Sequence, residues 1–128
     1  MKKQKGKIGK IVNIEDWSFE RFKKLLIEAE HCDAMMIRIV AEAGIERWQN
    51  DCERLVQLTD FVREQAYMAH FREDSDLTGT WLQINEQICD CAKEHLSVEG
   101  YHKYLEDSGT YYASTGEEFL EMIRFQCK

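Results

Sequence analysis

No proline occurs among the 128 residues, and this absence constrains the fold more than any other feature of the sequence. Proline breaks a helix interior because it lacks an N–H and clashes with the preceding turn. Long helices in this chain therefore meet no interruption of that kind. Isolated glycines fall between stretches of helical periodicity, where they predict helix ends: Gly44, Gly79, Gly100, Gly109 and Gly116. The pattern predicts an all-α fold.

The first predicted helix begins with Asp16 or Ser18 as its cap and runs to about Ala43, where Gly44 ends it. A break is expected near residues 31–33, the most polar part of this stretch. One face of the helix carries apolar residues at helical spacing: Phe19, Phe22, Leu26, Ala29, Met36 and Ile39 or Val40.

The second predicted helix covers about Ile45 to Phe71 and has the broadest apolar stripe, which places it at the centre of a bundle or along a dimer seam. A charged connection over residues 72–76 follows it. Thr80 and Gln83 have the spacing of a capping box, in which each side chain satisfies a free backbone N–H, and they predict the start of a third helix.

Two short helices complete the predicted bundle. A turn around Tyr101 to Leu105 precedes a loop over residues 107–114, and Thr115 with Glu118 forms a second capping box before the last helix. Short connections favour antiparallel neighbours. We therefore predict a single compact antiparallel helical bundle of three long and two short helices over residues 16–128. Residues 1–15 are predicted to form an extended arm or a short edge strand.

The sequence also gives expectations about compartment. No apolar run reaches the ~20 residues of a membrane span, and the lysines near the N-terminus are not followed by a signal-peptide core. The five cysteines are an odd number, so they favour reduced thiols that act as small core residues. We therefore expect a cytoplasmic protein with no membrane contact.

Charge is distributed unevenly along the chain. Residues 1–10 hold five lysines and no acid, whereas residues 73–121 hold twelve acids and only Lys93 and Lys103 as bases. This opposition favours charged partners. Within the acidic half, a stretch of twelve residues contains four tyrosines, and tyrosine is enriched in binding hot spots. The predicted partner-binding residues are Tyr101, Tyr104, Tyr111, Tyr112, Glu99, Glu106 and Asp107.

Two other binding functions compete with this hypothesis. Glu-x-x-His spacing places two metal ligands on one helix face, and it occurs twice in the chain: Glu28 with His31, and Glu99 with His102. The second alternative is a nucleic-acid accessory role, in which the basic arm follows phosphates without sequence preference. Its candidate residues are Lys2, Lys3, Lys5, Lys7 and Lys10.

Enzymatic activity is not predicted. The chain has no Gly-x-Ser-x-Gly sequence, no phosphate-binding glycine loop and no dinucleotide fingerprint, and its glycines are isolated. No cofactor is expected. The sequence thus predicts a small non-enzymatic adaptor or inhibitor. It would bind a basic surface, such as that of a nucleic-acid-handling protein, through its acidic tyrosine-rich half.

Overall fold

The computed structural model describes residues 18–126, with side chains through residue 123. The described residues form six helices and no strand, which confirms the predicted all-α class. Contacts within the chain separate two compact units, Met1–Arg47 and Trp48–Lys128. The sequence predicts one unit over residues 16–128, and five helices rather than six. The predicted arm or strand over residues 1–15 lies outside the described residues.

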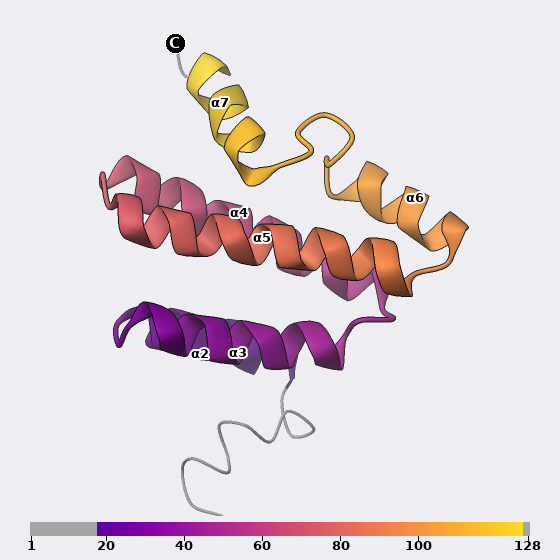
Figure 1. The fold of residues 1–128 in the computed structure, drawn as a ribbon, viewed down its shortest axis with the longest axis horizontal. Coiled ribbons are helices and arrows are strands. Elements are labelled where there is room, and N and C mark those ends of the chain that lie inside the picture. The colour runs from indigo at the N-terminus through magenta and orange to yellow at the C-terminus, as the bar shows by residue number, and fades with distance from the viewer. Residues whose placement is uncertain (1–17, 127–128) are drawn as a thin grey trace, which may run out of the picture. The chain divides into compact units, whose positions relative to one another are not determined.

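The first unit contains a helical hairpin made of α2 (Phe19–Glu30) and α3 (Ala34–Arg47), shown at the indigo end of the chain in Figure 1. The hydroxyl of Ser18 accepts a hydrogen bond from the backbone N–H of Arg21 at 3.1 Å and caps α2. The predicted break over residues 31–33 is confirmed, because the carboxylate of Asp33 accepts from the N–H of Met36 at 2.8 Å as the chain turns into α3.

The sequence predicts that Gly44 ends a helix, but this prediction is wrong. Gly44 lies buried inside α3. A Cβ atom at this position would collide with the ring of Phe22 on α2. The glycine therefore lets the two helices of the hairpin approach closely. A glycine in a helix interior costs about 0.5–1 kcal/mol relative to alanine, and here the close packing of the Phe22 ring offsets that cost.

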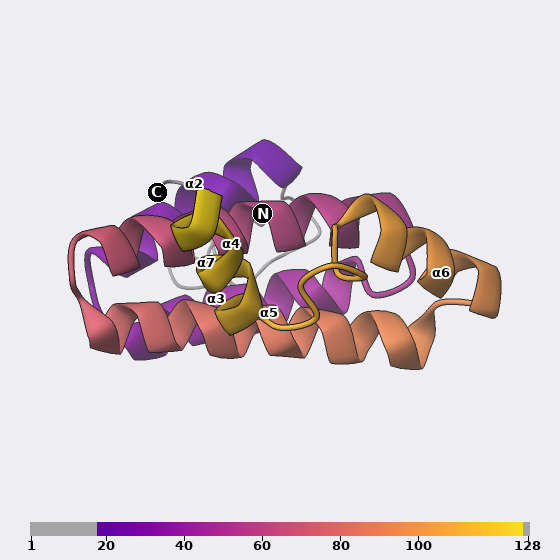
Figure 2. The ribbon, with the colours of Figure 1, turned by 90° about the horizontal axis from the view of Figure 1, so that it is seen from above.

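The second unit is built on a pair of long helices, α4 (Cys52–Phe71) and α5 (Ser75–His95), joined by only three residues. Figure 2 shows them side by side along their whole length. Their N-caps are Asp51 and Asp74, whose carboxylates accept from backbone N–H groups three residues later. The helices bury large apolar side chains between them, among them Leu55, Leu58, Val62, Trp81, Ile84 and Ile88.

Two predicted helix starts in this region are wrong. The second predicted helix does not begin at Ile45, which lies in α3, because Asp51 offers a stronger N-cap after a turn. The third does not begin at Thr80 either. Asp74 caps α5 six residues earlier, and the buried Thr80 hydroxyl donates to the carbonyl of Asp76 at 3.1 Å inside the helix. Gly79 therefore lies within α5 rather than at a helix end.

Two short helices pack on this pair: α6 (Val98–Asp107) and α7 (Gly116–Gln126). Ser97 caps α6 by accepting from the N–H of Gly100 at 3.0 Å, so Gly100 is helical and does not end a helix. The predicted cap of the last helix is confirmed, since the Thr115 hydroxyl accepts from the N–H of Glu118 at 3.1 Å. Within residues 18–126, no helix is long and apolar enough to cross a membrane.

Two glycine substitutions test this packing. Gly44→Ala should lower the free energy of unfolding by about 1–3 kcal/mol, because the new methyl group overpacks the site of the fully buried Phe22. Gly79→Ala should raise the free energy of unfolding by about 0.5–1 kcal/mol, because no described atom outside its own helix turn lies within 4 Å of the new Cβ. Urea denaturation followed by circular dichroism measures both, and equal effects of the two substitutions would contradict the packing.

Candidate protein-interaction surface

The four clustered tyrosines occupy different environments. Tyr104 on α6 is fully buried, and its ring stacks on that of the half-buried Tyr101, with 6.4 Å between the ring centroids. Tyr111 and Tyr112, in the segment between α6 and α7, are 53% and 82% exposed. Of the predicted partner-binding tyrosines, Tyr104 therefore cannot contact a partner in the folded chain, whereas Tyr111 and Tyr112 can.

The predicted acidic residues lie on the exposed side of α6. Glu99, His102 and Glu106 follow one another at spacings of three and four, so they share one helix face, here called the acidic α6 face. The hydroxyl of Tyr111 lies 2.6 Å from Nδ1 of His102 in the middle of this face. Within residues 18–126, the carboxylates of Glu99 and Glu106 accept no hydrogen bond and form no ion pair.

Asp107 differs from the other predicted acids because its charge is already paired. Its carboxylate accepts from Nζ of Lys103 at 2.8 Å, one helical turn away. This hydrogen bond raises the pKa of Lys103 above its ordinary value. The pair is exposed, so it adds little to stability. The two glutamates of the acidic α6 face, by contrast, have no ion pair of this kind among the described residues.

Tyr111 and Tyr112 are held on a well-bonded loop, Ser108–Thr115, here called the tyrosine loop. Gly109 adopts a left-handed conformation with φ of 77°, which only glycine takes without strain. The N–H of Tyr111 donates to the carbonyl of Leu105 at 3.2 Å, and the N–H of Ala113 to the carbonyl of Gly109 at 3.0 Å. These bonds fix the backbone on both sides of the exposed tyrosines.

The strongest attachment of the tyrosine loop to the core comes from Arg63 on α4. This side chain is only 3% exposed. Its Nη2 donates to the carbonyl of Ala113 at 2.8 Å, and its Nε donates to Oδ1 of Asn85 on α5 at 2.7 Å. The guanidinium also lies 5.4 Å from the ring centroid of Phe119 on α7. Burial lowers the pKa of Arg63, so these hydrogen bonds must replace the lost hydration of a cation.

A second set of polar contacts continues from Asn85 to α6. Nδ2 of Asn85 lies 3.7 Å from Sγ of Cys89, which in turn lies 3.3 Å from the hydroxyl of Tyr104. The same hydroxyl is 2.7 Å from Oγ1 of Thr59 on α4. Burial raises the pKa of Tyr104 well above its ordinary value, so the phenol is neutral. Together with Arg63, these contacts connect α4, α5, α6 and the tyrosine loop.

Apart from Tyr104, which was predicted to bind a partner, none of these connecting residues was predicted from the sequence as part of the site, although α4 carries a signal for them. Thr59 and Arg63 lie one turn apart inside an otherwise apolar stripe that includes Leu55, Val62 and Ala66. Buried polar side chains of this kind are nearly always hydrogen-bonded. No buried side-chain nitrogen or oxygen lacks a partner among the residues that the structure describes.

The alternative sites are less well supported. Over residues 18–126, no group of three or more His, Cys, Asp or Glu side chains could hold a metal ion. Glu28 and His31 lie at the end of α2, and Glu99 and His102 on α6, where His102 already contacts Tyr111. The five lysines of the predicted nucleic-acid site, Lys2, Lys3, Lys5, Lys7 and Lys10, lie outside the described residues.

The cysteines follow the expectation only in part. Cys32, Cys52, Cys89 and Cys91 are all free thiols, but only Cys91 is buried and Cys32 is exposed. Burial raises the pKa of Cys91 and of Cys52. A low thiol pKa is typical of reactive cysteines, so these two resemble structural residues.

In comparisons with family models, curated proteins and solved structures, nothing matches this chain. The case for a function therefore rests on the residues themselves.

Removal of the Arg63 side chain should loosen the tyrosine loop. Arg63→Met leaves the Asn85 amide oxygen and the Ala113 carbonyl without their donors, and we expect the free energy of unfolding to fall by about 2–4 kcal/mol. Backbone hydrogen exchange at Tyr112 and Ala113 should become faster. Arg21→Met, at an exposed arginine on α2, is the matched control. Equal exchange rates in both variants would contradict the role of Arg63.

Tyr104 makes stability depend on alkaline pH. Because its pKa is raised in the folded state, the stability from its neutral phenol is complete below about pH 10, the ordinary tyrosine pKa. It is lost as the pH rises further, by up to about 1.4 kcal/mol per pH unit. Tyr104→Phe should be less stable at pH 8 by about 1–3 kcal/mol but should lose less stability between pH 9 and 11. Parallel pH profiles for wild type and variant would refute this account.

Proposed function

We propose that this chain is a small non-enzymatic interaction protein, an adaptor or inhibitor that binds the basic surface of a protein partner. Its binding surface is the acidic α6 face together with the exposed part of the tyrosine loop. The observation that carries the proposal is Tyr112, which is 82% exposed on a loop whose backbone is bonded to the buried Arg63 through the neighbouring Ala113.

The rigidity of the loop supports a binding role because ordering a loop on association costs free energy. In this chain, the hydrogen bonds of Gly109 and Ala113 order the loop when the protein folds, so binding a partner requires no further ordering of its backbone. A tyrosine ring adds a large contact area with only two rotatable side-chain bonds. An exposed tyrosine on a fixed loop is therefore suited to serve as an anchor in an interface.

The charge of the surface indicates the kind of partner. Glu99 and Glu106 flank Tyr111 on one face of α6, and Glu117 and Glu118 begin α7 at the other end of the loop. Carboxylates around an aromatic centre complement a surface that is rich in lysine and arginine. Such surfaces are characteristic of proteins that handle nucleic acids, and we infer a partner of this kind. An inhibitor would act by covering the phosphate-binding residues.

Photo-crosslinking at single positions tests the proposal. A benzophenone amino acid at position 112 should form a crosslink to one discrete protein in cells that produce this chain, because Tyr112 would lie inside the interface. Mass spectrometry identifies the captured protein, and its crosslinked segment should be rich in lysine and arginine. The yield should fall several-fold between low salt and about 0.5 M salt, since the attraction of exposed charges is screened.

A matched control carries the same amino acid at position 86, an exposed glutamate on α5 outside the proposed surface. The double variant Glu99→Gln, Glu106→Gln should reduce the yield from position 112 without lowering thermal stability. The proposal fails if positions 112 and 86 capture the same set of proteins, or if the captured segment is acidic or apolar.

A further inference from the structure

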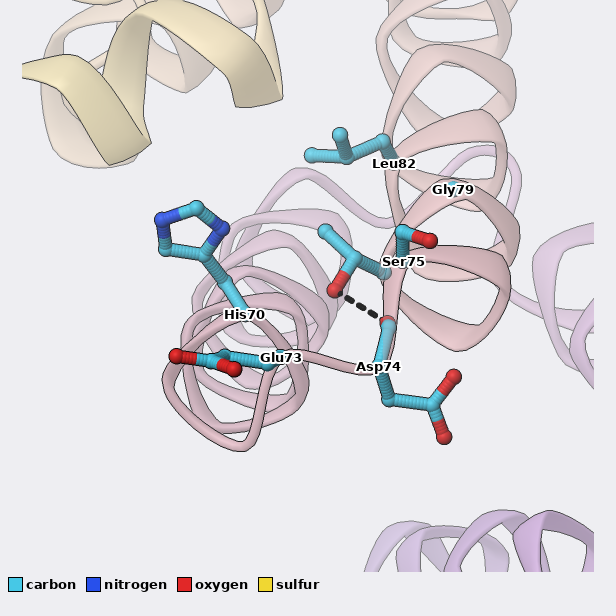
Figure 3. Close-up of a pocket in the computed structure, with 7 residues that line it drawn as sticks. His70, Glu73, Asp74, Ser75, Gly79 and Leu82 are labelled. Carbon is cyan, nitrogen blue, oxygen red and sulfur yellow. Dashed lines mark hydrogen bonds between the residues drawn. The ribbon is translucent and has the colours of Figure 1, made fainter.

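A second surface feature lies at the N-terminal end of α5, next to the connection from α4. Here a hollow of about 370 Å³ is lined by residues from both helices and from the connection between them, among them His70, Glu73, Thr78, Gly79 and Leu82. Figure 3 shows the imidazole of His70 and the side chain of Leu82 on opposite sides of the space, with the carboxylate of Glu73 below His70. The carboxylate of Asp74 points away from the hollow, and it caps α5. We call this feature the Gly79 hollow.

The glycine in this hollow has no packing reason within the described residues. A Cβ atom at Gly44 would collide with Phe22, and one at Gly116 would collide with Leu82. A Cβ atom at Gly100 would lie 3.2 Å from Oγ of Ser97. At Gly79, by contrast, no described atom outside its own helix turn lies within 4 Å. Because glycine weakens a helix interior, its use here leaves open a space that the described part of the chain does not fill.

The chemistry of the hollow indicates what would fit it. Its inner surface is formed by the backbone at Gly79 and the side chains of Leu82 and Thr78. The Thr78 hydroxyl donates a hydrogen bond to the backbone carbonyl of Asp74. This surface is therefore mostly apolar and suits an apolar group. The volume is large enough for an aromatic or long aliphatic side chain, since ligand-binding pockets begin at roughly 300 Å³.

The surroundings of the hollow are acidic on balance. Glu73 lines it, Asp74 and Asp76 are exposed on the connection and the first turn of α5, and Arg72 is the one exposed base on this segment of residues 72–76. Glu73 is held with φ of 63°, which fixes the turn where its carboxylate stands. Phe71, directly after His70, is 78% exposed and adds apolar surface at the same end of the helix pair. An apolar floor with acidic neighbours complements an apolar side chain flanked by cationic ones.

We propose that the Gly79 hollow is a docking site for a basic protein segment, which inserts one large apolar side chain between lysines or arginines. The apolar side chain lies on Leu82 and the open backbone at Gly79. The flanking cations lie near Glu73 and Asp76. This site is separate from the tyrosine loop, and the proposal does not require the function proposed above, although one basic partner could use both surfaces.

Short peptides supply the probe for a test with the full ¹⁵N-labelled chain. Acetyl-Lys-Phe-Lys-amide should cause saturable shifts of the backbone amide signals of Gly79 and Leu82. Acetyl-Lys-Ala-Lys-amide, without the ring, should bind about tenfold more weakly, because burial of an aromatic side chain is worth at least that factor. Acetyl-Glu-Phe-Glu-amide should also bind more weakly, because its carboxylates are repelled by those of Glu73 and Asp76.

Matched variants locate the site. Gly79→Leu fills the hollow and should abolish the shifts, whereas Gly79→Ala, which adds one methyl group, should retain most of the binding. Thermal denaturation shows whether both variants are folded. If Gly79→Leu does not fold, Glu73→Gln replaces it and should reduce the preference for the lysine peptide over the glutamate peptide.

Several results would overturn the proposal. One is an absence of saturable shifts at Gly79, and another is equal affinity for the phenylalanine and alanine peptides. A third is peptide binding by folded Gly79→Leu that equals that of the wild type. Where Glu73→Gln is used instead of Gly79→Leu, an unchanged preference for the lysine peptide over the glutamate peptide would also overturn it. A change at Gly79 when residues 1–15 are deleted, without any peptide, would instead show that the chain's own N-terminal segment fills the hollow. Tyr112→Ala should leave peptide binding unchanged, so this test and the crosslinking test at position 112 can fail independently.

Discussion

The second unit of this protein depends on a single buried cation. The guanidinium of Arg63 is taken out of water, so its N–H groups need acceptors at fixed places. Those acceptors are Asn85 on α5 and the backbone of Ala113 in the tyrosine loop, and the ring of Phe119 lies over the group. Within the described residues no carboxylate pairs with it directly. The positions of α5, α7 and the tyrosine loop around α4 are therefore coupled through one side chain.

The helical class could be predicted from periodicity, but the role of the glycines could not. A glycine is read from sequence as a helix end because it tolerates left-handed backbone. Among the glycines that the structure describes, only Gly109 has that conformation, whereas Gly44 and Gly116 permit close contact with Phe22 and Leu82. Close approach depends on a residue far away in the sequence or on another helix. Local sequence carries no record of that neighbour, so the helix end predicted at Gly44 was wrong.

The two predicted capping boxes show the same limit. Thr80 with Gln83 and Thr115 with Glu118 have equal spacing, but only the second begins a helix. Asp74 provides an earlier cap for α5, and once that helix has formed, Thr80 satisfies its hydroxyl on the preceding turn. No competing cap precedes α7 so closely, because Gly109 and the bonds of the tyrosine loop hold that chain out of a helix. Competition between neighbouring caps decides which pattern is used.

The sequence could not separate the tyrosines of the candidate site. Tyr104 and Tyr112 lie in the same acidic, tyrosine-rich segment, yet Tyr104 is fully buried and Tyr112 is 82% exposed. The difference arises from α4, where Thr59 offers the Tyr104 hydroxyl a buried partner, and Arg63 holds the backbone next to Tyr112. Neither residue is near the tyrosines in sequence.

This arrangement links the stability of the core to the shape of the surface. Because Arg63 bonds directly to the backbone at Ala113, any loss of the buried hydrogen bonds frees the loop that presents Tyr112. If a partner binds the loop in its fixed form, as proposed, that binding would stabilise the folded core by mass action. In the proposed interface, the acidic α6 face would add charge that acts at longer range and speeds encounter. Its glutamates are exposed and form no ion pair within the described residues, so changing them should alter association far more than folding.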